Sequence, residues 1–470
     1  MTKIKLSALA CAILVGGGQQ LVAEDSNNII DLGNYSYQTV DINNEKKIIT
    51  GNSEGAVINV KNNGELRSEV SDFFYTDINI KKNSNATFEN EVWLDNPKLH
   101  IKNNSNAIFE NEVSIEYPNF HIINNSTAVF NKALYMWNAD DDRWPVIEQD
   151  NDFSGGNLSL DNSTLDIKGT AEFDETSVLI NHGSTATIDY LDDYGSKIYV
   201  VNDSELEINK DAIFRGTHLI IKDNSNTTIK GELTAEYSAI YEDNKIYVVN
   251  DSKLEIDKNA IFDEGTHLII ENNSNTTING ALTIKDYDDS EFAKGGIKIA
   301  KSNLNVAGEV NFYHSDTELN NSSNVNFKDK LTLLDSAMLL KNSSSLSVGG
   351  VADFTDSALV VQNGSKVMFG NNFTMKNGGA EKSIIILDNG SEINVKGDLP
   401  DQGGQAHVGW RERVPRHSHR GHPETRLCCK GRRRAVHGEV LQRRWRRHRG
   451  HRRRHRQSAS GHRNYDGRRC

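Results

Sequence analysis

Apolar and polar residues alternate in short runs along most of the chain, and the runs repeat. The motif Ser-x-apolar-x-apolar recurs, and the commonest step between successive serines is 21 residues. The fourth residue after each serine is always Ile, Phe or Val, as in Phe88, Ile208 and Val348. Alternation of this kind over four or five residues is typical of a strand with one buried face. The repeated serines are Ser84, Ser105, Ser126, Ser163, Ser184, Ser204, Ser225, Ser252, Ser274, Ser302, Ser323, Ser344, Ser365 and Ser391.

Each period contains two more predicted strands. Residues 8 and 10 positions after the serine are apolar in most copies, as are those 6 and 4 positions before it; Val92 and Leu94 illustrate the first pair. A lone short strand cannot bury its apolar face, but coils that stack can do so together. We therefore predict an all-β fold, a parallel β-helix with three short strands per coil of about 21 residues. The crossover rule for parallel strands makes a right-handed coil the default.

The pattern divides the chain into four parts. Residues 1–23 are predicted to be a signal peptide, with Lys3 and Lys5 before an apolar run at residues 6–15. Cys11 is an alternative lipidation site, but the apolar run continues past it. Residues 24–75 lack the clean register and are predicted to hold an N-terminal cap and the first irregular coils. Residues 76–400 carry the repeats, and residues 401–470 are predicted to be a disordered tail.

Charge separates the tail from the body. Residues 1–400 contain 60 Asp and Glu against 32 Lys and Arg, a net charge of −28, whereas residues 401–470 contain 5 against 21, a net +16. An acidic body is not expected to bind nucleic acid. For the Arg- and His-rich tail we favour a reading-frame error. The alternatives are a basic tail that binds nucleic acid or anionic lipid, and a metal site at Cys428 and Cys429, whose adjacent cysteines lack zinc-site spacing.

A signal segment followed by many Asn-Ser-x-Leu-x-Ile coils, with no cysteine between residues 12 and 427, resembles the passenger domains of type V autotransporters. The resemblance covers residues 1–400. It implies export across the inner membrane to the cell surface, the outer membrane or the medium, and a role in virulence as an adhesin or autoaggregation factor. The implied partners are glycans or proteins of host or bacterial surfaces, or further copies of the chain. The family also carries a C-terminal translocator barrel in the outer membrane, whose alternating segments are missing from this chain.

Four steps between serines are longer than the rest, and all four place their extra residues at the same point of the coil. These insertions are residues 137–156, 236–245, 285–296 and 376–384. Protrusions gathered at one corner of a repeat rod are often its binding face. Tryptophan can stack on a sugar, and carboxylates can bond its hydroxyls. The candidate binding residues are therefore Trp137, Asp140, Asp141, Asp142 and Trp144 in the first insertion, and Tyr287, Asp288 and Asp289 in the third.

Two other interpretations of these insertions remain open. They could be solvated acidic loops without a ligand, or the aspartate run could take Ca²⁺ through its oxygen atoms. We predict no cofactor, no metal site and no catalytic residue. β-Helices also host polysaccharide lyases and hydrolases, but Arg67, Arg143 and Arg215 are not neighbours by register, and His218 and His267 are duplicated outward residues. A polysaccharide-degrading enzyme and an inactive passenger fragment stay as alternatives to the adhesin.

Overall fold

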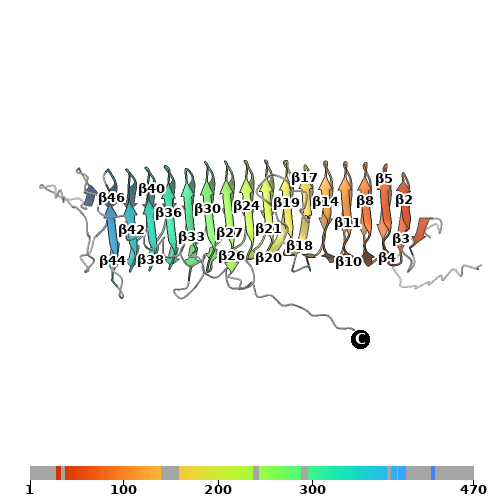
Figure 1. The fold of residues 1–470 in the computed structure, drawn as a ribbon, viewed down its shortest axis with the longest axis horizontal. Coiled ribbons are helices and arrows are strands. Elements are labelled where there is room, and N and C mark those ends of the chain that lie inside the picture. Colours follow the sequence, from red (N-terminus) through yellow and green to blue (C-terminus); the bar gives the residue numbers. More distant parts are fainter. Residues whose placement is uncertain are drawn as a thin grey trace, which may run out of the picture.

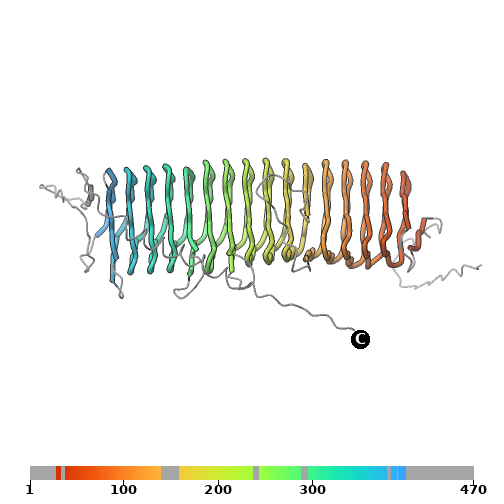
Figure 2. The backbone as a smooth tube through the Cα atoms, in the orientation of Figure 1, coloured from red at the N-terminus to blue at the C-terminus, as the bar shows by residue number. Residues whose placement is uncertain are grey.

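The chain coils into a rod of short parallel strands, a parallel β-helix (Figure 1). The computed structural model describes residues 28–32, 38–138, 158–236, 243–286, 295–377, 383–388 and 390–398, and the backbone of Thr425–Cys428. The described residues contain no α-helix. Each coil contributes three strands, as the sequence predicts, and the tube in Figure 2 shows the coils stacked along one axis. The predicted fold class, an all-β parallel β-helix, is confirmed.

The first strand of each coil belongs to a sheet of 16 strands, which we call ladder 1. At about 4.8 Å per step, sixteen strands make a rod about 70 Å long. Its strands are β2 (Thr39–Asn43), β5 (Val57–Lys61), β8 (Asp77–Lys81), β11 (Lys98–Lys102), β14 (Phe120–Ile123), β17 (Leu158–Asp161), β19 (Ser177–Asn181), β21 (Lys197–Val201), β24 (His218–Lys222), β27 (Lys245–Val249), β30 (His267–Glu271), β33 (Gly296–Ala300), β36 (Asp316–Asn320), β39 (Ala337–Leu340), β42 (Ala358–Val361) and β45 (Ile384–Leu387).

The second strand of each coil forms ladder 2, which carries the residues that follow the repeated serine. It runs through β1 (Ile29–Asp31), β3 (Lys46–Thr50), β6 (Glu65–Ser68), β9 (Asn85–Phe88), β12 (Asn106–Phe109), β15 (Thr127–Phe130), β18 (Thr164–Asp174), β20 (Thr185–Tyr194), β22 (Glu205–Ile208), β25 (Asn226–Ile229), β28 (Lys253–Ile256), β31 (Asn275–Ile278), β34 (Asn303–Val306), β37 (Asn324–Phe327), β40 (Ser345–Val348), β43 (Lys366–Phe369) and β46 (Glu392–Val395). All of these strands pair in parallel with their neighbours.

The third strand forms ladder 3. It joins ladder 2 in one sheet because β18 and β20 run through both ladders without a break. Its other strands are β4 (Ser53–Glu54), β7 (Asp72–Phe74), β10 (Val92–Asp95), β13 (Val113–Glu116), β16 (Leu134–Trp137), β23 (Ala212–Arg215), β26 (Leu233–Glu236), β29 (Ala260–Phe262), β32 (Leu282–Lys285), β35 (Val310–Tyr313), β38 (Leu331–Leu334), β41 (Ala352–Thr355) and β44 (Phe373–Lys376).

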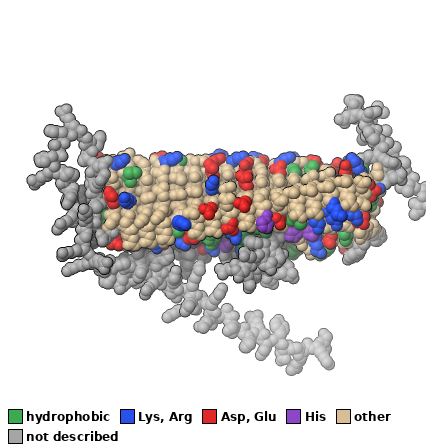
Figure 3. Space-filling model, turned by 90° about the horizontal axis from the view of Figure 1, so that it is seen from above, with side chains coloured by type: hydrophobic (Ala, Val, Ile, Leu, Met, Phe, Trp, Pro, Cys, Tyr) green, Lys and Arg blue, Asp and Glu red, His purple; other side chains and the backbone are tan. Residues whose placement is uncertain are grey.

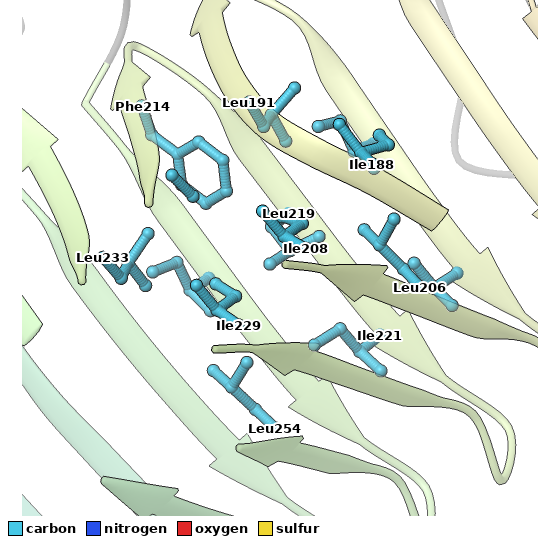
Figure 4. Packing of buried hydrophobic residues seen from close by; sticks show 14 of the residues in the cluster. Ile188, Leu191, Leu206, Ile208, Phe214, Leu219, Ile221, Ile229, Leu233 and Leu254 are labelled. Carbon is cyan, nitrogen blue, oxygen red and sulfur yellow. The ribbon is translucent and has the colours of Figure 1, made fainter. Parts of the chain in front are cut away.

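The apolar residues of the repeat line the inside of the coil. Leucine, isoleucine and phenylalanine side chains from all three ladders meet there, and most of them are fully buried (Figure 4). Equivalent residues stack from coil to coil. Phe88, Phe109 and Phe130 form one such column, in which successive ring centroids lie 4.5 Å apart and the planes are almost parallel. Stacked copies therefore supply the burial that one coil cannot.

The corner between ladders 1 and 2 is built from the Asn-Ser part of the repeat. Two consecutive residues there have positive φ, such as Asn103 and Asn104, each at 60°. Asparagine adopts this backbone conformation more readily than most residues. Asparagines of successive coils also bond to each other, as in Asn124 Nδ2 to Asn103 Oδ1 at 2.9 Å. Figure 3 shows one long side of the rod on which uncharged groups make most of the surface.

The repeated serine is buried just after this corner. Its Oγ accepts a hydrogen bond from the backbone N–H of the serine one coil earlier, as from Ser84 N to Ser105 Oγ at 3.2 Å. The same bond links Ser105 to Ser126 and Ser344 to Ser365. A second ladder of this type runs along the corner before ladder 1, where Ser336 N donates to Ser357 Oγ at 3.2 Å. The serine columns thus satisfy buried backbone donors where the chain turns.

Segments from both ends of the chain pair with the regular coils. Strands β2 and β5, within the segment expected to hold a cap and irregular coils, pair in parallel and in register with β8. Strand β1 covers the open edge of β3. At the other end, the backbone of β47 (Thr425–Cys428) pairs antiparallel with β46. An unpaired edge presents free N–H and C=O groups, so any extended segment can bond to it.

The coil that contains β20 departs from the repeat. The register between β18 and β20 shifts between Ile167 and Thr170, and Asp193 then pairs with Phe173 on one side and Phe214 on the other. Both phenylalanines point inward and are buried. Asp193 therefore occupies an inward position that belongs to a large apolar residue in the neighbouring coils.

Candidate functional site

All four insertions leave the rod at the corner between ladders 3 and 1. They follow β16, β26, β32 and β44, which lie in the same ladder, and the chain re-enters at β17, β27, β33 and β45. In the other coils this corner is a tight turn with one positive-φ residue, such as Tyr75 or Gly216. We call it the insertion corner. The outward residues of ladder 3 border this corner and are therefore the first candidates for a binding site.

Trp137 is the one candidate binding residue whose position the structure describes. It is the last residue of β16, half-buried, and it lies in register with Glu116 on one side and Asp174 on the other. Asp140, Asp141, Asp142, Trp144, Tyr287, Asp288 and Asp289 lie outside the described residues. At the base of the third insertion, the backbone N–H of Gly295 donates to Oδ2 of Asp286 at 2.8 Å. Asp286 is thus a buried structural residue that ties the two ends of this insertion together.

Beside the insertion corner, ladder 3 presents a surface rich in aromatic rings and carboxylates. We call it the acidic-aromatic face. The last outward residues of eight successive strands form its outer column: Phe74, Asp95, Glu116, Trp137, Asp174, Tyr194, Arg215 and Glu236. The outward residues two positions earlier form its second column, which includes Asp72, Trp93, Ser114, Tyr135, Glu172 and Asp192. Trp93 is 46% exposed and its ring centroid lies 6.2 Å from that of Phe74.

Arg215 is the single basic residue in these two columns, and carboxylates and an aromatic ring surround it. Its Nε bonds to Oε2 of Glu236 at 2.7 Å, and its Nη1 bonds to Oδ1 of Asp192. Its guanidinium carbon lies 4.5 Å from the centre of the Tyr194 ring. The arrangement combines a charge-assisted hydrogen-bond pair with a cation–π contact. It shows how a guanidinium group is held on this surface.

Carboxylates on the face are close enough to change the pKa of their neighbours. Burial, and then the neighbouring carboxylates of Asp192 and Asp174, raise the pKa of Glu172, while Arg215 acts in the opposite direction. Burial followed by the charges of Glu112 and Glu172 raises the pKa of the Tyr135 hydroxyl. Both shifts have the sign expected where anionic groups crowd together. A cation placed between these groups would gain favourable energy from all of them.

The arrangement around Arg215 is not predicted from the sequence, because the repeat motif is defined by its inward apolar positions and does not align the outward residues of ladder 3. The register of the three arginines gives no signal either, because Arg67 and Arg143 are not neighbours of Arg215. The usable signal lies nine and eleven positions after each repeated serine, where outward residues of successive coils stack. Tyr135 and Trp137 follow Ser126 at these distances, and Glu172 and Asp174 follow Ser163.

The duplicated histidines lie on the other side of the insertion corner. His218 and His267 are the first residues of β24 and β30, and each is half-buried. Burial lowers the pKa of His267, against the opposing effect of Asp243. Across the described ranges, no three His, Cys, Asp or Glu side chains form a group suited to a metal ion. The same part of the chain has no helix long and apolar enough to cross a membrane.

Comparison with known proteins gives no relative for this chain. No protein-family model matches it, and neither the curated proteins nor the solved structures contain a match. The class of the protein is therefore stated from its fold alone, as a parallel β-helix, which fits both a passenger-type rod and a β-helix enzyme.

Proposed function

We propose that this protein is a surface-displayed binding rod of the autotransporter passenger class, exported from the cell and acting as an adhesin or autoaggregation factor. The observation that carries the proposal is the gathering of all four insertions at one corner, where the first two leave the rod beside the acidic-aromatic face. A long rod with several protrusions along one corner can make several weak contacts at once, and these add up to firm attachment.

The contacts that Arg215 already makes favour binding over catalysis. A polysaccharide lyase or hydrolase needs free carboxylates and a cation directed at the substrate. The guanidinium group of Arg215 is instead engaged by Asp192 and Glu236 and lies on the Tyr194 ring. A reducing-end assay on neutral and acidic polysaccharides tests the enzymatic alternative, and product formation would favour it over the binding rod.

The structure permits a clean removal of two insertions. Deleting residues 139–155 and 287–294 leaves three residues between the last residue of ladder 3 and the first inward residue of ladder 1, the same spacing as residues 96–98 before Leu99. We expect the deleted protein to keep its β spectrum and to lose most of its adherence to cells, measured with bacteria that display it. Deleting residues 378–382 from the fourth insertion, which contain no aromatic residue, is the matched control and should leave adherence unchanged. Unchanged adherence in the first deletion would show that this corner is not the binding site.

A further inference from the structure

We propose that the acidic-aromatic face binds an arginine-rich polypeptide segment, with guanidinium groups held between aromatic rings and carboxylates. This inference rests on the proposed function, since it names the class of partner for the same side of the rod. It is carried by the residues of the outer column and by the position that Arg215 occupies among them.

Arg215 provides an internal example of the bound group. In the outer column its register neighbours are Tyr194 and Glu236. The aromatic ring supports the flat side of the guanidinium group, and the two carboxylates of Asp192 and Glu236 accept its N–H groups. Arginine combines a planar donor array with weak hydration, which suits it to such a site better than lysine.

Aromatic rings and carboxylates also lie side by side at other points of the outer column. Trp137 lies between Glu116 and Asp174 in register, three coils before Arg215. Nearer the N-terminal end of the rod, the exposed Trp93 packs beside Phe74, and Asp95 is the register neighbour of Phe74 in the outer column. Both tryptophans face outward from ladder 3 and offer the best ring type for a cation–π contact. The column therefore offers at least two further positions of the Arg215 type.

Charge selects against the competing ligands. From β10 to β26 the two columns carry Asp95, Glu116, Glu172, Asp174, Asp192 and Glu236 against the single cation Arg215. This excess repels acidic polysaccharides and nucleic acids. A neutral glycan could stack on the tryptophans but would leave the carboxylate excess unused. A cationic peptide uses both the rings and the charges.

The test measures binding of a fluorescent nona-arginine peptide to the full chain by anisotropy, at low and at physiological salt. We expect binding that weakens with salt, because the contact is electrostatic. Trp137→Ala should weaken it about fivefold through loss of the ring, and Glu116→Gln with Glu172→Gln should weaken it about tenfold. Trp93→Ala is a second, independent ring variant. Glu205→Gln with Glu255→Gln removes the same charge from exposed outward positions of ladder 2 and serves as the control.

Three outcomes would overturn the inference. One is an equal loss in the two glutamine pairs, which would indicate attraction by net charge alone. Another is equal affinity for nona-lysine, which would exclude guanidinium-specific sites. The third is binding of a neutral oligosaccharide that the Trp137→Ala variant abolishes while nona-arginine does not bind. Peptide binding in solution is measured apart from cell adherence, so loss of adherence in the insertion deletions would support the proposed function even if the peptide failed to bind.

Discussion

At the scale of single residues, Asp193 is the clearest departure from the repeat. It is fully buried where the neighbouring coils place Phe173 and Phe214. Its Oδ1 accepts hydrogen bonds from Thr217 Oγ1 at 2.5 Å and from Ser196 N at 3.2 Å, whereas no described residue bonds to Oδ2. Burial raises the pKa of this carboxyl from 3.8 to about 7. The core of this coil therefore contains a carboxyl group that can gain or lose a proton near neutral pH.

The sign of the resulting pH dependence follows from linkage. Because the folded-state pKa lies above that of the unfolded chain, the folded state binds more protons between pH 4 and 7. The contribution of Asp193 to stability is fully present below the unfolded value and is lost as pH rises through about 7, a change on the order of 4 kcal/mol. We expect Asp193→Asn to melt higher than the parent at pH 8, and this advantage to shrink or reverse at pH 4.5.

Thermal unfolding followed by circular dichroism measures this difference. Asp166→Asn, on the outward and partly exposed side of β18, is the matched control. Its melting temperature should follow that of the parent at both pH values. A constant offset between Asp193→Asn and the parent across the pH range would contradict the assignment.

At the scale of elements, each corner is maintained by a column of small polar residues. The buried serine accepts a bond from the preceding coil and in several coils also donates to a backbone carbonyl. Ser126 Oγ, for example, accepts from Ser105 N at 3.3 Å and donates to Ile123 O at 2.8 Å. One hydroxyl thus links two successive coils and closes the turn of its own coil. A buried backbone donor that loses such a partner costs about 1–3 kcal/mol.

We expect Ser105→Ala to destabilise the coils around it by about 1–3 kcal/mol, because Ser84 N would lose its acceptor. Stability in a stacked repeat is local, so the useful measurement is hydrogen exchange of the amides near residues 84 and 105. Ser114→Ala, at a half-buried outward position of β13, should change exchange by no more than about 0.5 kcal/mol. Equal protection in the two variants would show that the serine column is not a stabilising element.

At the scale of the whole molecule, the rod is a stack in which each coil contacts its neighbours. Ladders 1 and 2 continue from the first described coils to the last, so no unique coil is required to hold the others. Removing whole coils should therefore shorten the rod and preserve its fold.

Deleting residues 303–365 removes three steps of 21 residues and joins Ser302 to β43 in the register of the missing β34. We expect a soluble β-rod shorter by about 14 Å, measured from the largest dimension in small-angle X-ray scattering. Deleting residues 303–355 instead joins Ser302 to β42, so that a ladder 1 strand follows another without ladders 2 and 3. This second deletion should break the stack at the junction and unfold the coils next to it, so that β content falls by more than in the first deletion. Similar behaviour of the two variants would argue against independent coils.

The sequence predicts the inside of the rod better than its outside. Inward positions such as Phe109 and Leu94 are predictable because a two-residue period fixes which side chains are buried, and both are buried. Asp193 is not predictable, because its place inside depends on a register shift between two particular strands. The second ladder of serines and threonines, with Ser336 and Ser357, is likewise not predicted, because the repeat motif contains only the first serine of each coil.

The sequence alone determined the parallel β-helix, its three strands per coil and the single corner that carries the insertions, because periodicity and spacing are local properties of the chain. Only the tertiary structure decided which outward residues meet. Trp137, Asp174, Tyr194 and Arg215 are separated by about one coil of sequence each, and they form one column because parallel pairing stacks equivalent positions. A surface built in this way depends on the exact register of every coil between its members, and that register is set by the packing of the whole stack.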